Sequence, residues 1–221
     1  EVLTYKEASK IVFDFMTQMS KYSDYKSDAL EGDIGQIIIL GGLNPDGTYF
    51  CNDLTEIFLC QQGKLGKPDP KTFLRVSGNM PEALLRTAIE CLTYKTGSPL
   101  FSNDDVVIPS LLEFGIPESD AYSYCVSACW EPFIVGKSLD QNNIAVYDFF
   151  SALDEVFYQN AIDFDEFVEM YKKASARKFK ELLKNIDKMK WAKDPLVSMF
   201  TDSCSNRRKD ISEGAAIYNN Y

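Results

Sequence analysis

The sequence predicts an α/β fold in which parallel βα units are followed by a layer of helices. Up to residue 126, short runs of β-branched and aromatic residues alternate with amphipathic segments, at a spacing of about 25 to 35 residues. This alternation is typical of consecutive βαβ crossovers, and therefore of a parallel sheet or part of a barrel. From residue 139 onward, apolar residues recur at helical spacing instead.

The composition narrows the class of protein. The 221 residues are 45% hydrophobic and 25% charged, which is ordinary for a folded domain with a large core. The net charge of -10 argues against a nucleic-acid surface, because phosphate contact needs clustered Lys and Arg. One basic run, over residues 172–193, is interrupted by Glu181 and Asp187, and we interpret it as a solvated helix face.

The cysteines indicate a reducing compartment. Of the six, Cys60, Cys91 and Cys125 lie in apolar runs, where buried and reduced thiols are expected. The sequence contains no signal peptide and no apolar run long enough to span a bilayer. We therefore expect a cytoplasmic protein without membrane contact. Because the chain begins at Glu1 rather than Met, we also expect it to be an excerpt of a longer protein.

The first half of the chain is predicted to form one helix and then three βα units. The helix covers residues 5–21, and the first strand covers residues 36–40, a run that is apolar on both faces and ends at Gly41-Gly42. The following elements are a turn at 44–47, a helix from Asn52 or Asp53 to about 62, a strand at 72–76, a helix from Pro81 to about 92, a strand at 99–101, a capping turn at Asn103-Asp104-Asp105 and a helix at 106–114.

A fourth strand, predicted at residues 121–126, leads into Cys129-Trp130-Glu131. Pro132 can neither continue a helix nor donate to a central sheet, so we expect these three residues on a loop at a strand end.

The later segments are predicted to be helices, at residues 142–160, 163–189 and 195–202. Their aromatic side chains are expected to pack inward as core: Phe149, Phe150, Phe157, Tyr158, Phe164 and Phe167.

Most motif tests exclude a class of site. The chain has no histidine, so it cannot assemble a Cys-His or Ser-His-Asp centre or an imidazole zinc site, and no metal site is expected. Gly136-Lys137-Ser138 resembles the end of a phosphate-binding loop, but Glu131 stands where that loop needs Gly. Cys125 and Cys129 have the first spacing of an iron-sulfur loop, yet Pro132 occupies the third ligand position.

A thiol and a carboxylate two positions apart remain, with no histidine to serve as a base. This pair is compatible with radical chemistry, in which Cys129 loses a hydrogen atom and Glu131 handles a proton separately.

Six ordered motifs make the chain similar to the central region of glycyl radical enzymes, the family that includes pyruvate formate-lyase. They are Leu40-Gly41-Gly42 with Asn52-Asp53-Leu54-Thr55; Pro70 with Leu74-Arg75-Val76; Gly97 to Asp104; Gly115-Ile116 with Asp120 to Tyr124; Ala128 to Pro132 with Gly136-Lys137-Ser138; and Gly214 to Asn219.

The resemblance implies that the strands belong to a ten-stranded barrel, with the Cys loop running into its interior. It also implies that Cys129 carries a thiyl radical that abstracts hydrogen from a small substrate, and that Glu131 is the general base of a radical elimination, either a dehydration or C–N or C–O cleavage. No cofactor is expected in this chain itself. The glycyl radical is expected elsewhere in the full-length protein, installed by a radical S-adenosylmethionine activating enzyme, and a homodimer is compatible with the family.

Residues 1–221 would then be a single barrel fragment, with a helical lead-in at 1–35, βα units and the Cys loop at 36–138, and a mainly helical part at 139–221. On its own this fragment is expected to be inactive, because no radical-bearing glycine loop is present in it. Two alternatives stay open: a radical acyltransferase or fumarate-adding synthase of the same family, and an inactive structural or partner-binding piece.

Residues other than Cys129 and Glu131 are also expected to influence the site. The family's elimination branch has Gly where this chain has Ala128 and a smaller residue where it has Trp130, which changes the expected pocket shape. Trp130 and Arg75 are candidate substrate contacts. A structural salt bridge is favoured for Arg75, and a helix cap for the Asn103-Asp104-Asp105 turn.

Overall fold

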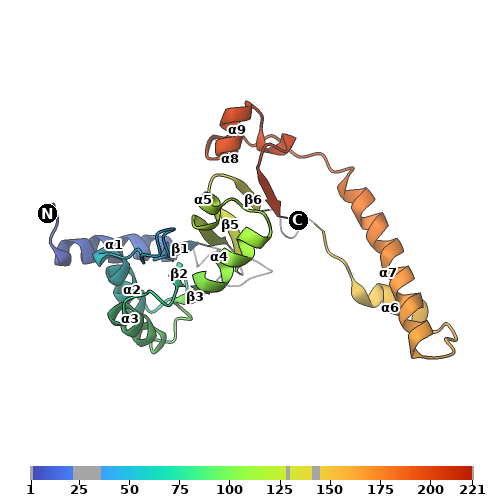
Figure 1. Ribbon diagram of the computed structural model, residues 1–221, viewed down its shortest axis with the longest axis horizontal. Helices are drawn as coiled ribbons and strands as arrows, with labels where there is room; N and C mark the ends of the chain where they lie inside the picture. Colours follow the sequence, from blue (N-terminus) through green and yellow to red (C-terminus); the bar gives the residue numbers. More distant parts are fainter. Residues whose placement is uncertain (1, 22–35, 128–129, 141–144, 221) are drawn as a thin grey trace. The chain divides into compact units, whose positions relative to one another are not determined.

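The computed structural model describes residues 2–21, 36–127, 130–140 and 145–220. The chain divides into two compact units, Glu1–Val135 and Gly136–Tyr221, which are described separately (Figure 1).

The first unit opens with α1 (Tyr5–Ser20), as predicted. A capping box begins this helix: the Thr4 hydroxyl accepts from the Glu7 amide, and the Glu7 carboxylate accepts from the Thr4 amide. Val12 and Met16 on its buried side pack against Ile57 of α2 (Asp53–Leu65). The side chain of Asn52, one of the two residues predicted to cap α2, accepts from the Thr55 amide.

A parallel three-stranded sheet organises this unit. Its strands are β1 (Ile37–Leu40), β2 (Lys71–Val76) and β3 (Leu100–Asn103), in the order β1-β2-β3. In register, Ile39 lies beside Phe73, and Phe73 lies beside Leu100. The crossovers contain α2 and α3 (Glu82–Leu92), so the predicted succession of parallel βα units is confirmed for these three strands.

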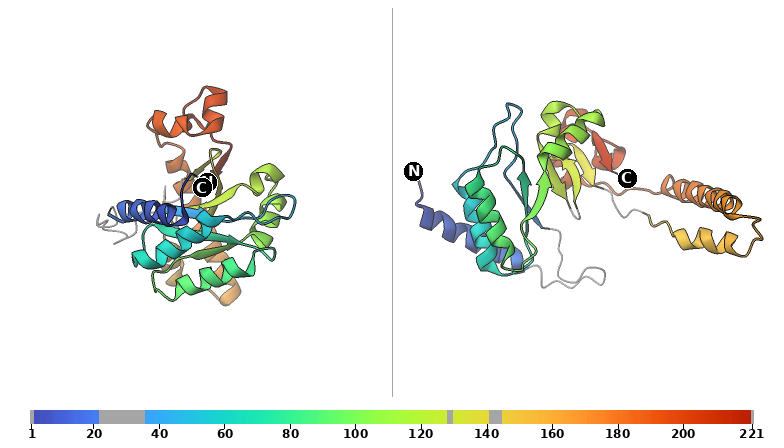
Figure 2. Two further views of the ribbon diagram at one scale, coloured as in Figure 1. Left: turned by 90° about the vertical axis from the view of Figure 1, so that its left-hand side faces the viewer. Right: turned by 60° about the horizontal axis from the view of Figure 1, so that its bottom comes forward.

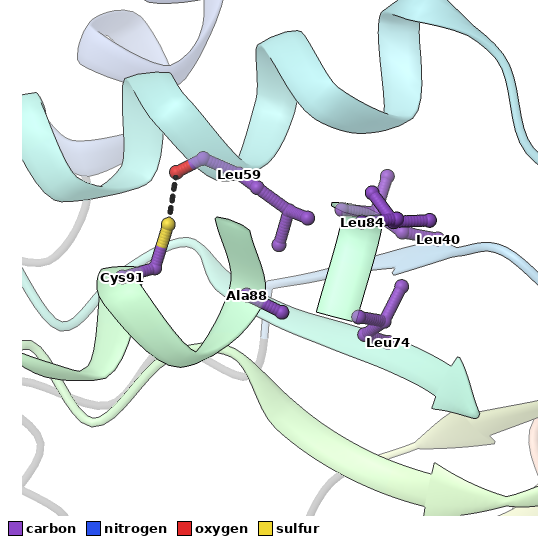
Figure 3. Close-up of a cluster of buried hydrophobic side chains, with 6 residues drawn as sticks. All are labelled: Leu40, Leu59, Leu74, Leu84, Ala88 and Cys91. Atoms are coloured by element: carbon purple, nitrogen blue, oxygen red, sulfur yellow. Dashed lines mark hydrogen bonds between the residues drawn. The ribbon is translucent and has the colours of Figure 1, made fainter. Parts of the chain in front are cut away.

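The helices cover one face of the sheet. Leu40 and Leu74 point from the strands into a cluster with Leu59 of α2 and with Leu84, Ala88 and Cys91 of α3 (Figure 3). The Cys91 thiol donates to the carbonyl oxygen of Leu59 at 3.1 Å. Burying each of these leucines stabilises the fold by roughly 1.5 to 3 kcal/mol. Because strand residues alternate between faces, Phe73 and Arg75 point away from these helices.

The chain after β3 differs from the predicted pattern. Following α4 (Asp104–Glu113), a short α5 (Glu118–Ala121) occupies the start of the predicted fourth strand. The strand itself, β4 (Tyr124–Ser127), pairs antiparallel with β5 (Glu131–Ile134) rather than joining the parallel sheet. The prediction that Glu131 lies on a loop was therefore wrong. A two-stranded sheet has only edge strands, which tolerate the missing N–H of Pro132.

The second unit contains a helical hairpin and a smaller mixed part. The hairpin consists of α6 (Phe149–Phe157) and α7 (Phe164–Ile186), and α7 is capped by the Asp163 carboxylate. The mixed part contains a parallel strand pair, two short helices and a 3₁₀ turn: β6 (Ser138–Asp140), β7 (Tyr218–Asn220), α8 (Pro195–Met199), α9 (Asp202–Arg207) and η2 (Ile211–Glu213). Figure 2 shows α6 and α7 side by side. Residues 145–148, predicted as helix, are not helical, and residues 142–144 lie outside the described part.

The aromatic residues of this hairpin do not form the predicted core. Ala152, Val156 and Ala174 make the buried seam between α6 and α7, and only Phe167 of the aromatic set packs against it. The other five are 63% to 84% exposed: Phe149, Phe150, Phe157, Tyr158 and Phe164. The prediction was wrong for these five because small residues bring two helices together along a narrow seam, which leaves large side chains outside it.

Two further observations concern the described residues as a whole. Within them, no helix is long and apolar enough to cross a membrane. Cys51, Cys60, Cys91, Cys125 and Cys204 are free thiols. Cys91 and Cys125 are buried as predicted, whereas Cys60, also predicted to be buried, is only partly buried.

Candidate functional site

The β4–β5 hairpin holds the residues predicted to carry the chemistry. Ser127 at the end of β4 pairs with Glu131 at the start of β5, and the Trp130 amide donates to the Ser127 carbonyl at 3.1 Å. Cys129 belongs to the connection between these strands and lies outside the described residues. Trp130 has φ +95°, a conformation that a bulky side chain rarely adopts. The surrounding contacts must hold this backbone in place.

Trp130 lies against the sheet. Its ring meets the ring of Phe73 edge to face, with the centroids 5.5 Å apart and the planes at 83°. Phe73 is 1% exposed and belongs to the face of β2 that the helices leave uncovered. The tryptophan itself remains 44% exposed, so one side of it is available to another group. The hairpin is thus seated on the non-helical face of the sheet.

Arg75 makes a second contact between the sheet and the hairpin. Its Nε and Nη2 donate to the two carboxylate oxygens of Asp104, at 2.9 and 2.8 Å. Its Nη1 donates to the carbonyl oxygens of Tyr122 and Tyr124, at 2.9 and 3.1 Å. The guanidinium carbon also lies 4.1 Å from the centroid of the Tyr124 ring, a cation–π contact. The salt bridge favoured for Arg75 is therefore present, and it is buried.

The Asp104 carboxylate accepts hydrogen bonds from residues of several elements. Besides Arg75, the Tyr124 hydroxyl donates to it at 2.6 Å and the Leu43 amide at 2.7 Å. Ser102 completes the cluster through its hydroxyl, 2.8 Å from that of Tyr124. Asp104 is fully buried and is the first residue of α4, where the helix dipole favours a negative charge. Burial, and then the hydrogen bond to Asp104, raise the pKa of Tyr124, so this hydroxyl stays a donor.

Two glycines after β1 make room for this cluster. Gly41 and Gly42 have φ +67° and +144°. A Cβ at Gly42 would lie 3.0 Å from the guanidinium carbon of Arg75, and one at Gly41 would lie 2.2 Å from the Tyr49 hydroxyl, which donates to the Arg75 carbonyl. Glycine is therefore required at both positions for two reasons: neighbouring side chains leave no room for a Cβ, and the backbone has a positive φ.

Glu131 is the described member of the predicted catalytic pair. Its side chain is half-buried, and its Oε2 is shielded from solvent. One oxygen of this carboxylate is therefore removed from solvent, and the role of Glu131 as a base stays a prediction. Among the residues that the structure describes, no group of three or more Cys, Asp or Glu side chains could hold a metal ion.

The contact between Asp104 and Tyr124 was not predicted from the sequence. Asn103 does cap α4 as predicted, by accepting from the Asp105 amide, but its neighbour Asp104 turns inward to Arg75. The residue that could have predicted it is Arg75, because a charged side chain among the buried residues of a strand needs a buried counter-ion.

The chain is similar to known proteins over its whole length. The family described as pyruvate formate lyase-like matches residues 1–221. The isethionate sulfite-lyase of Oleidesulfovibrio alaskensis is 28% identical over 123 residues, 56% of this chain and 15% of that protein. The trans-4-hydroxy-L-proline dehydratase of Clostridioides difficile is 25% identical over 229 residues, and the match covers 92% of this chain and 27% of that protein.

A solved structure agrees with these matches at the level of fold. It comes from Roseburia inulinivorans and is described for 1,2-propanediol dehydration; its TM-score is 0.84 at 24% identity, over 98% of this chain and 29% of that one. The predicted α/β fold with parallel βα units of this barrel type is confirmed. The chain spans less than a third of each of the three proteins named.

Proposed function

Because this chain belongs to the pyruvate formate lyase-like family, that of the glycyl radical enzymes, we propose that it supplies the thiol and carboxylate of a radical lyase or dehydratase. The substrate would be a small hydroxylated compound. The names of two relatives, a sulfite-lyase and a dehydratase, support an elimination over an acyl transfer. The structural observation that carries the proposal is the β4–β5 hairpin, in which one oxygen of the Glu131 carboxylate is shielded from solvent and the neighbouring Trp130 packs on Phe73 of the sheet.

In this proposal Cys129 transfers hydrogen atoms and Glu131 transfers a proton. As a thiyl, Cys129 takes a hydrogen atom from the substrate carbon that bears a hydroxyl, giving a thiol and a carbon radical. The Glu131 carboxylate takes the proton of that hydroxyl while the group on the neighbouring carbon departs; in a dehydration the proton then passes to the departing hydroxide to give water. The product radical regains a hydrogen atom from the Cys129 thiol, which restores the thiyl.

The proposal extends to the rest of the enzyme. A glycyl radical elsewhere in the full-length protein would supply the oxidising equivalent, after installation by a radical S-adenosylmethionine activating enzyme. Residues 1–221 would form one stretch of the barrel domain of a protein that can be a homodimer, and this stretch alone would not turn over. A reducing cytoplasm is the proposed location, which the free thiols among the described cysteines support.

Two substitutions in the activated full-length enzyme test the division of labour. Cys129→Ala should yield no product from propane-1,2-diol or isethionate, whichever the wild-type enzyme accepts. Glu131→Gln should still exchange substrate hydrogen but form product about a hundredfold more slowly or worse, because a general base contributes that much or more. Electron paramagnetic resonance of the glycyl radical checks that every variant was activated.

Matched controls are Cys51→Ala, at a half-buried thiol, and Glu113→Gln, at an exposed carboxylate of the same unit. Both should keep wild-type turnover. Product from Cys129→Ala, or equal rates for Glu131→Gln and Glu113→Gln, would refute the assigned roles. A wild-type enzyme that carries the radical but converts none of these substrates would point to another reaction of the family.

A further inference from the structure

Arg75 binds the start of the strand that leads to the Cys129 connection and Glu131, through the carbonyl oxygens of Tyr122 and Tyr124. We propose that Arg75 is a positioning residue: it fixes the β4–β5 hairpin on the sheet, so that Glu131 meets the substrate at the distance that proton transfer needs. This inference rests on the proposed function and assigns that site a residue that determines its geometry.

Arg75 binds backbone atoms of the hairpin strand. Its Nη1 bonds to the carbonyl oxygens of both Tyr122 and Tyr124, where the chain enters β4. Backbone carbonyls have no rotamers, so these two bonds fix where β4 begins. Ser127 follows three residues later and pairs with Glu131, so the register set at Tyr124 is transmitted to the carboxylate.

The guanidinium of Arg75 is itself held on several sides. Asp104 accepts two of its N–H groups, and the same carboxylate is held by the Leu43 amide and the Tyr124 hydroxyl. Gly42 lies against the guanidinium on another side. A lysine could not form all of these hydrogen bonds. The planar guanidinium has five N–H donors and can reach the carboxylate and the carbonyl oxygens at once, whereas an ammonium group is a single compact charge.

The backbone of Trp130 is strained, with φ +95°. A residue at φ +95° stays there only while its surroundings over-determine the conformation. The hairpin meets β2 through Trp130 on Phe73 and through Tyr124 on Arg75, two residues that share one face of the strand. If the Arg75 contact is loosened, Trp130 can relax, and Glu131 moves with it as the next residue in the chain.

Two buried thiols allow a test in the full-length enzyme before activation. Cys125 lies on β4, where its thiol donates to the Phe133 carbonyl, and burial raises its pKa to about 12. Cys91 lies on α3 behind the sheet, donates to the Leu59 carbonyl, and has a pKa raised by burial to about 11. Both react with iodoacetamide only when their surroundings open, since the thiolate is the reactive form.

Arg75→Lys should speed the alkylation of Cys125 about tenfold, the change expected from losing one hydrogen bond to a charged group, and that of Cys91 less than about twofold. Mass spectrometry of the labelled peptides measures both rates. Tyr124→Phe serves as the second variant, because it keeps the ring and removes only the hydroxyl. Arg86→Lys is the matched control, because Arg86 pairs with Glu82 on the exposed surface of α3.

A second measurement follows the chemistry of the activated enzyme, with substrate deuterated at the carbon that loses hydrogen. Cys129 takes the deuterium atom, its thiol exchanges with water, and a hydrogen atom returns either to the substrate or to the product radical. Misplacement of Glu131 slows only the elimination, so Arg75→Lys should raise the ratio of protium-labelled substrate to product about tenfold or more. A merely structural role would lower both yields in parallel and leave this ratio unchanged.

The outcomes separate the two proposals. Equal acceleration of Cys125 and Cys91 labelling, or no change in the ratio of exchanged substrate to product, would overturn the positioning role of Arg75. A wild-type enzyme that shows no turnover after successful activation would contradict the proposed function instead, while the labelling result would still stand as a measure of how Arg75 holds the hairpin.

Discussion

Replacing Asp104 by asparagine should destabilise the first unit far more than the same change at its neighbour Asp105. Both residues lie in the first turn of α4, so both substitutions remove one negative charge from the same helix end. They differ in surroundings: Asp104 is fully buried against Arg75, whereas Asp105 is exposed and accepts one bond, from the Gly78 amide.

The magnitude follows from the contacts. Asp104 accepts four hydrogen bonds, two from Arg75 and one each from Tyr124 and Leu43, and an asparagine can place only one oxygen among these donors. The Arg75 charge, 6% exposed, would then be buried without its counter-ion, a loss of about 3 to 5 kcal/mol. Loss of charge at a helix N-terminus, common to both variants, is worth about 0.3 to 1 kcal/mol. The difference should therefore be at least about 2 kcal/mol.

Hydrogen exchange read by mass spectrometry measures this difference in the intact protein. Amides of β2 and β4 should exchange about thirtyfold faster in Asp104→Asn than in Asp105→Asn, since about 1.4 kcal/mol corresponds to a factor of ten. Amides of β6 and β7, in the second unit, should be unchanged and serve as the internal control. Equal protection of β2 and β4 in the two variants would refute the reasoning that the Arg75–Asp104 pair stabilises this unit.

Two further predictions concern local structure in each unit. Gly42→Ala should lower the unfolding free energy by about 1 to 3 kcal/mol, and by more than Gly66→Ala, because both have positive φ but a Cβ meets the Arg75 guanidinium only at Gly42; equal melting temperatures would contradict the steric argument. In the second unit, hydrogen bonds led by that from the Ser212 hydroxyl lower the pKa of Asp210 to about 2 from 3.8. Its stabilising effect should be present above pH 3.8 and lost as pH falls toward 2, with faster exchange of the α8 and η2 amides, and Asp210→Asn should abolish this pH dependence.

The elements that the sequence predicted well are those whose signals are local. The strand runs at β1, β2 and β3, the capping side chains of Asn52 and Asn103 and the apolar spacing of α1 each depend on neighbours within a few residues. Such features depend on the propensities and capping side chains of nearby residues, so they can be predicted without knowing the tertiary contacts.

The features that the sequence did not predict depend on distant partners. Pro132 was interpreted as the end of regular structure, although an edge strand accommodates it beside Val126. The spacing of the aromatic residues Phe149 and Phe150 predicted an apolar side of a helix. It did not identify a partner for that side, and in the structure both residues are exposed. The pairing of Arg75 with Asp104 joins positions 29 residues apart, which no local pattern encodes.

The close contact between Gly42 and Arg75 constrains how this family of sequences can change. A side chain at position 42 and a guanidinium at position 75 compete for the same space, as do a side chain at position 41 and the hydroxyl of Tyr49. A side chain can replace either glycine only where the residue opposite it becomes smaller. Positions 42 and 75, and likewise 41 and 49, should therefore covary, and a relative that carries a side chain at position 42 should carry a shorter residue in place of Arg75.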